Sequence, residues 1–211
     1  MILAGAAAIR YNAGVSGGGA SRITIMPEPL VAEPIRLTYE DFLALPDDGK
    51  RYEILDGDLY MSPSPRTLHQ RLLLRLAIIL GEHVRCKGLG EVFIAPFDVV
   101  LGDNDIVEPD IVFVSEANRS IITEENIRGV PDLLVEVLSP TRPQYDLKNK
   151  RAVYARCGVP FYWIVDPEGR RLTELQLLDR AYAIVGELAG KPTFEPRLFP
   201  GLGIDLERLW T

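Results

Sequence analysis

Three charged residues of this sequence stand beside long apolar runs. Asp110 precedes IVFV, Glu136 lies within LLVEVL, and Lys150 belongs to a helical segment that leads into FYWIV. A buried carboxylate costs several kcal/mol unless it is paired with a cation or bound to a metal. Two carboxylates with a lysine close behind therefore indicate a catalytic site that binds a metal ion.

The two acids fall at matching places on two consecutive predicted strands. Neighbouring strands lie about 5 Å apart, a separation that lets two carboxylates share a divalent ion. Oxygen ligands without histidine or cysteine favour Mg²⁺ or Mn²⁺ over zinc. Such an ion lowers the pKa of a bound water and neutralises charge on a phosphate. We therefore expect phosphate-ester hydrolysis, with Lys150 steadying the attacking hydroxide or the scissile phosphate.

Three further residues are secondary candidates for this site. Glu108 stands two positions before Asp110 on the same face of a regular strand, so it could substitute as a ligand. His69 begins the longest predicted helix and either acts in catalysis or forms a structural hydrogen bond. Asp146 lies one helical turn before Lys150, where it either caps the helix, holds the lysine or acts in catalysis.

The composition is that of a globular protein with one domain. A chain of 211 residues is long enough for one sizeable core and short for two. Thirty acidic against 23 basic residues give a net charge of −7, which argues against nonspecific coating of nucleic acid. A nuclease stays open, because its carboxylates belong to that charge and a metal ion would offset them.

Cysteine content and hydropathy give an expected location and domain layout. Two cysteines, Cys86 and Cys157, are too few for a disulfide scaffold and match no zinc pattern, so we expect a cytoplasmic protein. The sequence has no apolar run of about 18 residues that would span a membrane. Residues 1–34, rich in Ala and Gly, are expected to be a flexible leader or a misassigned start, followed by a single domain over 35–211.

The elements that must position these residues follow from hydrophobic periodicity and turn signals. Asp56-Gly57 sits between two β-rich runs and predicts a hairpin. Helices are predicted over 37–45, capped by Thr38, over 67–84 and over 145–156. The inward residues of the helix over 67–84 are predicted to be Leu68, Leu72, Leu76, Ile79, Leu80 and Val84. We further predict a strand or broken pair over 91–101, strands over 106–114, 132–138 and 161–165, and a hairpin of 172–178 with 182–188. This order predicts an α/β fold with a mixed sheet.

These motifs, in this order, also carry a family resemblance. PD at 109–110, the glutamate of LLVEVLSP, a D-x-x-x-K helix and GVPFYWIVDP resemble the Uma2 (DUF820) family of the PD-(D/E)XK nuclease superfamily. YEILDGDLYMSPSP, the helix with His69 and EVFIAPFDVVL match too, so the resemblance covers roughly residues 37–205. It implies a restriction-endonuclease-like αβββαβ core with an N-terminal β-hairpin, and Mg²⁺-dependent hydrolysis of phosphodiester bonds in DNA.

The resemblance also implies roles for individual residues. Asp110 and Glu136 correspond to metal ligands, while the position of the superfamily's usual lysine holds Leu138. Uma2-like sequences supply the lysine from the following helix, which corresponds to Lys150. Glu53 corresponds to an additional N-terminal acid, a ligand of a second metal or of the attacking water. The implied catalytic set is thus Asp110, Glu136, Lys150 and Glu53, the three acids being metal ligands for Mg²⁺ or Mn²⁺.

Two other readings of the same residues stay open. One is a nuclease-like module that binds nucleic acid or protein without turnover, and the other is a metal-dependent phosphohydrolase with a small substrate. Under the nuclease hypothesis DNA is the expected partner. A homodimer is then plausible as well, because cutting both strands of a duplex usually takes two sites.

Overall fold

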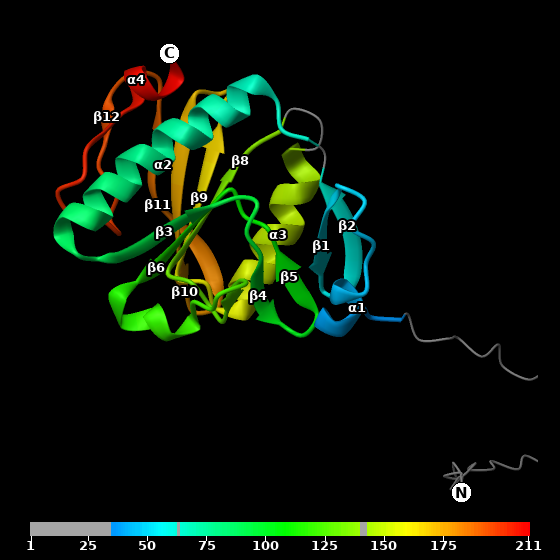
Figure 1. The fold of residues 1–211 in the computed structure, drawn as a ribbon. Coiled ribbons are helices and arrows are strands. Elements are labelled where there is room, and N and C mark those ends of the chain that lie inside the picture. Colours follow the sequence, from blue (N-terminus) through cyan, green and yellow to red (C-terminus); the bar gives the residue numbers. More distant parts are fainter. Residues whose placement is uncertain (1–34, 63, 140–142) are drawn as a thin grey trace, which may run out of the picture. The chain divides into compact units, whose positions relative to one another are not determined.

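The computed structural model describes residues 35–62, 64–139 and 143–211, with the side chains of residues 143–147 excepted. The predicted leader over residues 1–34 and the side chain of Asp146 therefore lie outside the described residues. Figure 1 shows the arrangement of helices and strands in the described part.

The helices are α1 (Tyr39–Leu43), α2 (Thr67–Lys87), α3 (Pro143–Cys157) and α4 (Leu206–Trp210), with a 3-10 helix η1 at Glu116–Ile121. The strands are β1 (Arg51–Leu55), β2 (Asp58–Ser62), β3 (Gly90–Ile94), β4 (Val99–Gly102), β5 (Asp105–Val107), β6 (Ile111–Ser115), β7 (Ile127–Arg128), β8 (Leu133–Val137), β9 (Phe161–Asp166), β10 (Arg171–Leu178), β11 (Ala181–Ala189), β12 (Thr193–Phe194) and β13 (Ile204–Asp205). The predicted helices and strands are confirmed except where noted below.

The strands form two larger sheets. A six-stranded sheet has the order β11-β10-β9-β8-β6-β3, and a five-stranded sheet has the order β2-β1-β5-β4-β7, while β12 and β13 pair separately. β8 runs parallel to β9 and antiparallel to β6, so the six-stranded sheet is mixed. The succession α2, β3, β6, β8, α3, β9 is the αβββαβ order expected of a restriction-endonuclease-like core, and the hairpin β1–β2 precedes it.

Alternate residues of the central strands pack against different helices. On β8, Leu133, Val135 and Val137 join the apolar cluster of α2, whereas Leu134 joins the cluster that contains Tyr154 of α3. A strand covered on both faces is expected to be apolar throughout, as LLVEV nearly is. Glu136 is the exception, and it belongs to the same face of β8 as Leu134.

Helix α2 buries one stripe against the six-stranded sheet and ends at Gly88. Leu72, Leu76, Leu80 and Val84 are buried as predicted, and Gly88 adopts the left-handed conformation that ends many helices, with φ of 62°. The inward position of Leu68 is a wrong prediction, because that side chain is 46% exposed. The first turn of α2 lies against the polar side chain of Asp110 and not over the apolar sheet.

The hairpin prediction is confirmed at the turn between β1 and β2. Asp56 and Gly57 both have positive φ, 53° and 81°. This pair of conformations matches the twist of antiparallel strands and favours glycine. A Cβ at Gly57 would also lie 2.7 Å from Cβ of Arg36, so the position has no space for a side chain.

The prediction of one continuous strand over residues 106–114 is wrong in one respect, because the observed strand is divided at Pro109. β5 pairs with β1 and β4 in the five-stranded sheet, whereas β6 pairs with β3 and β8 in the six-stranded sheet. Proline has no backbone N–H for a ladder hydrogen bond, so the strand is interrupted there and the chain changes sheets. Asp110 consequently lies directly before β6, at the junction of the two sheets.

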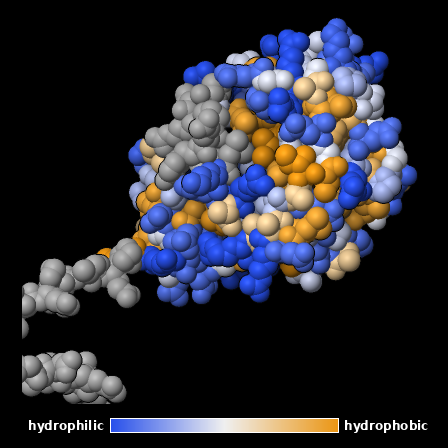
Figure 2. All heavy atoms as spheres, turned by 180° about the vertical axis from the view of Figure 1, so that it is seen from behind, coloured by the Kyte–Doolittle hydropathy of each residue, from blue (hydrophilic) through white to orange (hydrophobic). Residues whose placement is uncertain are grey.

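The surface seen in Figure 2 is largely hydrophilic, with apolar side chains gathered in places. The large apolar side chains that are substantially exposed include Leu74, Ile78, Leu178 and Ile184. Within the described ranges, none of the helices is both long enough and apolar enough to cross a membrane.

The packing of α2 gives a stability prediction. We expect Leu76→Ala to lower the free energy of unfolding by about 2–5 kcal/mol, because Leu76 is fully buried and its truncation leaves a cavity. Ile78→Ala, at a position that is 57% exposed on the same helix, should change it by less than about 1 kcal/mol. Urea denaturation of both variants measures the difference. Equal effects would contradict the assigned inward face of α2.

Candidate active site

Lys150 lies between two carboxylates that come from distant parts of the chain. Its Nζ is 2.9 Å from Oε1 of Glu53 and 2.9 Å from Oε1 of Glu136. The side chains of Lys150, Glu53 and Glu136 are only 10%, 4% and 14% exposed. A buried ammonium group is stable only when it is paired, and here both partners are charged. The fold therefore brings together Glu53, Glu136 and Lys150, three of the four residues in the expected catalytic set.

Three elements bring this group together. Glu53 is the middle residue of β1, Glu136 is the fourth residue of β8, and Lys150 lies in α3, which follows β8. Glu136 faces α3 because strand side chains alternate and its neighbours Val135 and Val137 face α2. The single inward glutamate of an apolar strand is thus directed at the lysine of the covering helix.

Asp110 contacts the other side of the site. Its Oδ2 accepts a hydrogen bond of 2.7 Å from the backbone N–H of Val137 and lies 3.0 Å from Nε2 of His69. The antiparallel register pairs Ile111 with Val135, so Asp110 and Glu136 stand one position further along, at the same end of neighbouring strands. The prediction that these two acids occupy matching places is confirmed.

His69 is placed in contact with Asp110 by the first turn of α2. Its side chain is 13% exposed, and its Nδ1 is buried without a hydrogen-bond partner in the part of the chain that the structure describes. Because Nε2 lies within hydrogen-bond distance of a carboxylate, His69 orients Asp110 directly. Among the described secondary candidates, His69 is therefore the one whose side chain contacts Asp110.

Glu53 and Glu108 are linked, but their carboxylates have different partners. Oε1 of Glu53 accepts from the backbone N–H of Glu108 at 2.8 Å, and its Oε2 accepts from Oγ of Ser62 at 2.9 Å. The carboxylate of Glu108 forms an ion pair of 2.7 Å with Arg51. Glu108 therefore does not share a regular strand face with Asp110, because the strand is broken at the intervening Pro109. Its role as a substitute ligand stays a prediction.

Tyr154 is a site residue that the sequence analysis did not identify. Its hydroxyl donates a hydrogen bond of 2.7 Å to Oε1 of Glu136, the oxygen that also accepts from Lys150. Tyr154 stands four residues after Lys150 on α3, so both side chains occupy the same helix face. This i, i+4 spacing from the lysine was the signal that could have identified it.

Burial and the closeness of several acids shift the pKa values of Glu136 and Lys150. Burial raises the pKa of Glu136 to about 7, Lys150 opposes this rise, and the negative charges of Asp110 and Glu53 add to it. Burial lowers the pKa of Lys150, but the charges of Glu136 and Glu53 outweigh it and hold that pKa well above its usual value. The site therefore carries a protonated lysine and an excess of negative charge that a divalent cation would relieve.

The residues present fit a divalent cation in part. Among the described residues no group of three or more His, Cys, Asp or Glu side chains is arranged to hold a metal ion. Yet Oδ1 of Asp110 and Oε2 of Glu136 accept no hydrogen bond from the described residues, since the bonds found fall on Oδ2 and Oε1. These two oxygens suit Mg²⁺ or Mn²⁺. Both oxygens of Glu53 already have other partners, so a metal ion would have to replace one of these contacts. The role of Glu53 as a metal ligand stays a prediction.

Asp110 is reached from a cavity of about 520 Å³. Polar residues of its wall include Ser62, Gln70 and Arg51, and Pro96 lies on it as well. A volume of this size is typical of a site for a small molecule or for one unit of a polymer. The candidate active site is therefore accessible from the side of Asp110, whereas Lys150 and Glu53 are buried behind it.

We expect the pH dependence of stability to report the pKa of Glu136. The folded protein keeps this carboxyl protonated at a pH where the unfolded chain, with a pKa near 4.5, has ionised it. Without metal, the stability of the wild type should therefore fall relative to Glu136→Gln as pH rises from about 4.5 to about 7, by up to about 3 kcal/mol. Urea denaturation from about pH 3.5 to about pH 8, roughly one unit beyond each value, measures this. A constant difference between the two proteins would show that Glu136 has an ordinary pKa.

Tyr154→Phe should disturb Glu136 as well as global stability. Loss of one buried hydrogen bond costs about 1 kcal/mol, and more when the acceptor is charged. Tyr182→Phe is a matched control, because the Tyr182 hydroxyl donates a buried hydrogen bond of 2.8 Å to the carbonyl of Val159 and not to the site. Both variants should lose stability, but only Tyr154→Phe should change the pH profile assigned to Glu136. The same profile in both variants would contradict a positioning role.

Comparisons with known proteins agree with this fold. The model of the Uma2 family, described as "Putative restriction endonuclease", matches residues 39–207. No curated protein matches the chain. The crystal structure of a putative nuclease belonging to DUF820 from Anabaena variabilis has a TM-score of 0.69 and 17% sequence identity, and the match covers 82% of this chain and 97% of that chain. At that identity the likeness shows the fold alone, whereas the family model spans most of the described sequence, so the chain belongs to the Uma2 family.

Proposed function

We propose that this chain is a nuclease that hydrolyses phosphodiester bonds in DNA with the help of Mg²⁺ or Mn²⁺. The observation that carries the proposal is the meeting of Asp110, Glu136 and Lys150 beside a cavity, in a chain of the Uma2 family. Two adjacent carboxylates and a lysine are the groups that metal-assisted phosphate hydrolysis uses. The description of the family as a restriction endonuclease supports the same reaction.

Asp110 and Glu136 are the residues that would hold the cation. A bound divalent cation would lower the pKa of a water molecule and offset charge on the scissile phosphate. His69 and the backbone N–H of Val137 fix the carboxylate of Asp110 through its Oδ2. Tyr154 and Lys150 fix the carboxylate of Glu136 through its Oε1. The chain thus orients both acids before any ligand binds, which lowers the cost of assembling the site.

Lys150 and Glu53 form the second part of the mechanism. The raised pKa of Lys150 keeps it charged at neutral pH, so its ammonium group is available to stabilise negative charge at the attacking or scissile oxygen. Glu53 pairs with the same ammonium group as Glu136, at the same distance of 2.9 Å. We assign Glu53 the role of positioning Lys150, with its oxygens fixed by Ser62 and by the backbone N–H of Glu108.

Basic residues near the cavity support a polyanionic substrate. Lys50 and Arg51 line the cavity beside Asp110, and Arg66 and Arg71 are exposed on and just before the first turns of α2. Their charges oppose the net negative charge of the chain near the proposed site of reaction. A substrate with several phosphates would contact more of these residues than a single small phosphoester would.

Cleavage of supercoiled plasmid tests the proposal. We expect nicking with Mg²⁺ or Mn²⁺, none with EDTA, and a loss of at least about a hundredfold in rate for Asp110→Asn and for Glu136→Gln, since each removes charge at the proposed metal site. Asp103→Asn is the matched control, because Asp103 is an exposed aspartate in the turn between β4 and β5. Gel electrophoresis over time gives the rates.

The outcomes separate the proposal from its alternatives. If the Asp110→Asn variant keeps metal-dependent nicking at the wild-type rate, the assignment of the active site is contradicted. Hydrolysis of a generic phosphodiester such as bis(p-nitrophenyl) phosphate without cleavage of DNA would favour a small-substrate phosphohydrolase. DNA binding with no hydrolysis of either substrate would favour a module without turnover. Thermal unfolding with added Mn²⁺ gives a separate measure of metal binding, because a ligand of the folded state raises its stability.

A further inference from the structure

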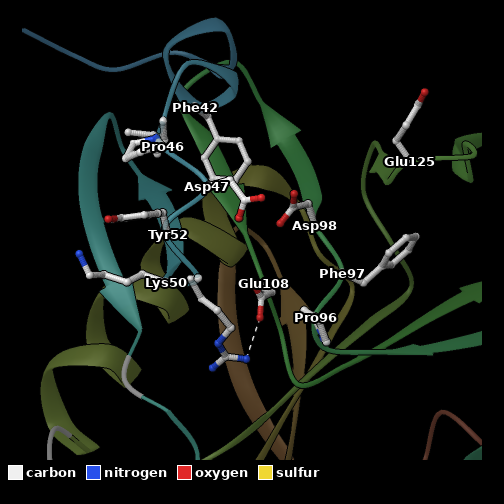
Figure 3. Close-up of a pocket in the computed structure, with 13 residues that line it drawn as sticks. Phe42, Pro46, Asp47, Lys50, Tyr52, Pro96, Phe97, Asp98, Glu108 and Glu125 are labelled. Carbon is white, nitrogen blue, oxygen red and sulfur yellow. Dashed lines mark hydrogen bonds and ion pairs between the residues drawn. The ribbon is translucent and has the colours of Figure 1, made fainter.

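A second pocket adjoins the candidate active site and is not used by the proposed mechanism. Its volume is about 580 Å³, and its wall contains Phe42, Tyr52 and Phe97 together with Asp47, Asp98 and Glu108. Figure 3 shows Asp47 and Asp98 directing their carboxylates into the same space, below the ring of Phe42. Aromatic side chains and carboxylates thus line one hollow.

This pocket is adjacent to the cavity that reaches Asp110. Gly49, Lys50, Arg51 and Pro96 line both hollows. Arg51 forms an ion pair of 2.7 Å, drawn in Figure 3, with Glu108 of the second pocket. A strand of nucleic acid whose phosphate lies beside Asp110 could therefore place a neighbouring nucleotide in the second pocket. Its volume falls in the range of pockets that enclose small organic ligands.

The carboxylate of Asp98 is the most distinctive polar group of the pocket. It is half-buried, and no described residue forms a hydrogen bond or an ion pair with it. Burial, and secondarily the charge of Glu53, raises the pKa of this carboxyl above its ordinary value. The described acids of the pocket form no cluster suited to a metal ion. Because this carboxylate lines the pocket, water can hydrate it in the free protein, and a ligand that donates N–H groups to Asp98 would take the place of that water.

The charges of the pocket decide which part of a nucleotide it can take. Asp47, Asp98, Glu108 and Glu125 outnumber Lys50 and Arg51, so a phosphate group would be repelled. A base can stack on aromatic rings such as Tyr52 or Phe97 and offer its edge to a carboxylate. Exocyclic amino groups are the partners that Asp and Glu accept from in base recognition. Thymine lacks such a group, and its one N–H donor on that edge, N3–H, lies between two carbonyl oxygens that a carboxylate would repel.

We propose that the second pocket binds one unpaired base of the strand being cut, and that it selects bases with an exocyclic amino group over thymine. This inference rests on the proposed nuclease function for its biological setting. The recognition itself depends only on the aromatic wall and on Asp98, so it is measurable without cleavage. The substrate class that follows is single-stranded or locally opened DNA, because a paired base is not free to enter a pocket.

Binding of nucleoside monophosphates tests the pocket directly. Titration calorimetry with dGMP and with dTMP, both without metal, should give a dissociation constant at least about tenfold lower for dGMP in the wild type. In Asp98→Asn, which keeps the size of the side chain, the ratio should fall to within about twofold. Asp103→Asn, which alters an exposed aspartate outside both pockets, should keep the wild-type ratio. Circular dichroism of both variants confirms that they are folded.

A cleavage assay on a randomised single-stranded DNA pool adds a second measure. Sequencing of the cut ends should show thymine depleted at one fixed position near the cut for the wild type, and this depletion should disappear in Asp98→Asn. Equal affinity for dGMP and dTMP, or a ratio that Asp98→Asn leaves unchanged, would overturn the inference even if DNA is cut. A preference for dGMP without any cleavage would uphold the pocket and count against the proposed nuclease function.

Discussion

The buried ammonium group of Lys150 is the constraint on which the rest of the site depends. It joins β1, β8 and α3 through two ion pairs, each 2.9 Å long, in a buried place. Removal of either acid would leave a buried charge with half of its compensation, which is strongly unfavourable. The hairpin, the central strand and the following helix are therefore tied to one another at the position where chemistry is proposed.

Much of the fold could be predicted from the sequence because its signals are local. The Asp56-Gly57 turn, the apolar stripe of α2 and the nearly continuous apolar strand β8 each reflect a short-range rule. Asp110 precedes one apolar run and Glu136 stands near the end of the next, and the antiparallel pairing of β6 with β8 brings them to the same end of the sheet. The inward assignment of Leu68 failed because periodicity extends to the end of a helix, whereas the apolar surface beneath that helix does not.

The parts of the site that could not be predicted depend on contacts between distant segments. The partnership of Glu53 with Lys150, the hydrogen bond from Ser62 and the contact of His69 with Asp110 need the three-dimensional arrangement of two sheets. Tyr154 was not identified, because its sequence offers only the i, i+4 spacing from Lys150, and the contact of its hydroxyl with Glu136 depends on how α3 packs against β8. The resemblance to the family identified the acids and the lysine, but not the groups that hold them in place.

The change of sheets at Pro109 makes the site sensitive to the relative orientation of the two sheets. Glu53 belongs to the five-stranded sheet and Glu136 to the six-stranded one. One of the connections between these sheets, Glu108 to Asp110, contacts Glu53 through the backbone N–H of Glu108 and Val137 of β8 through the carboxylate of Asp110. A change in the relative orientation of the two sheets would alter the distances from Lys150 to its two partners, because each partner belongs to a different sheet. The two ion pairs of Lys150 thus link the geometry of the proposed site to the relative placement of the sheets.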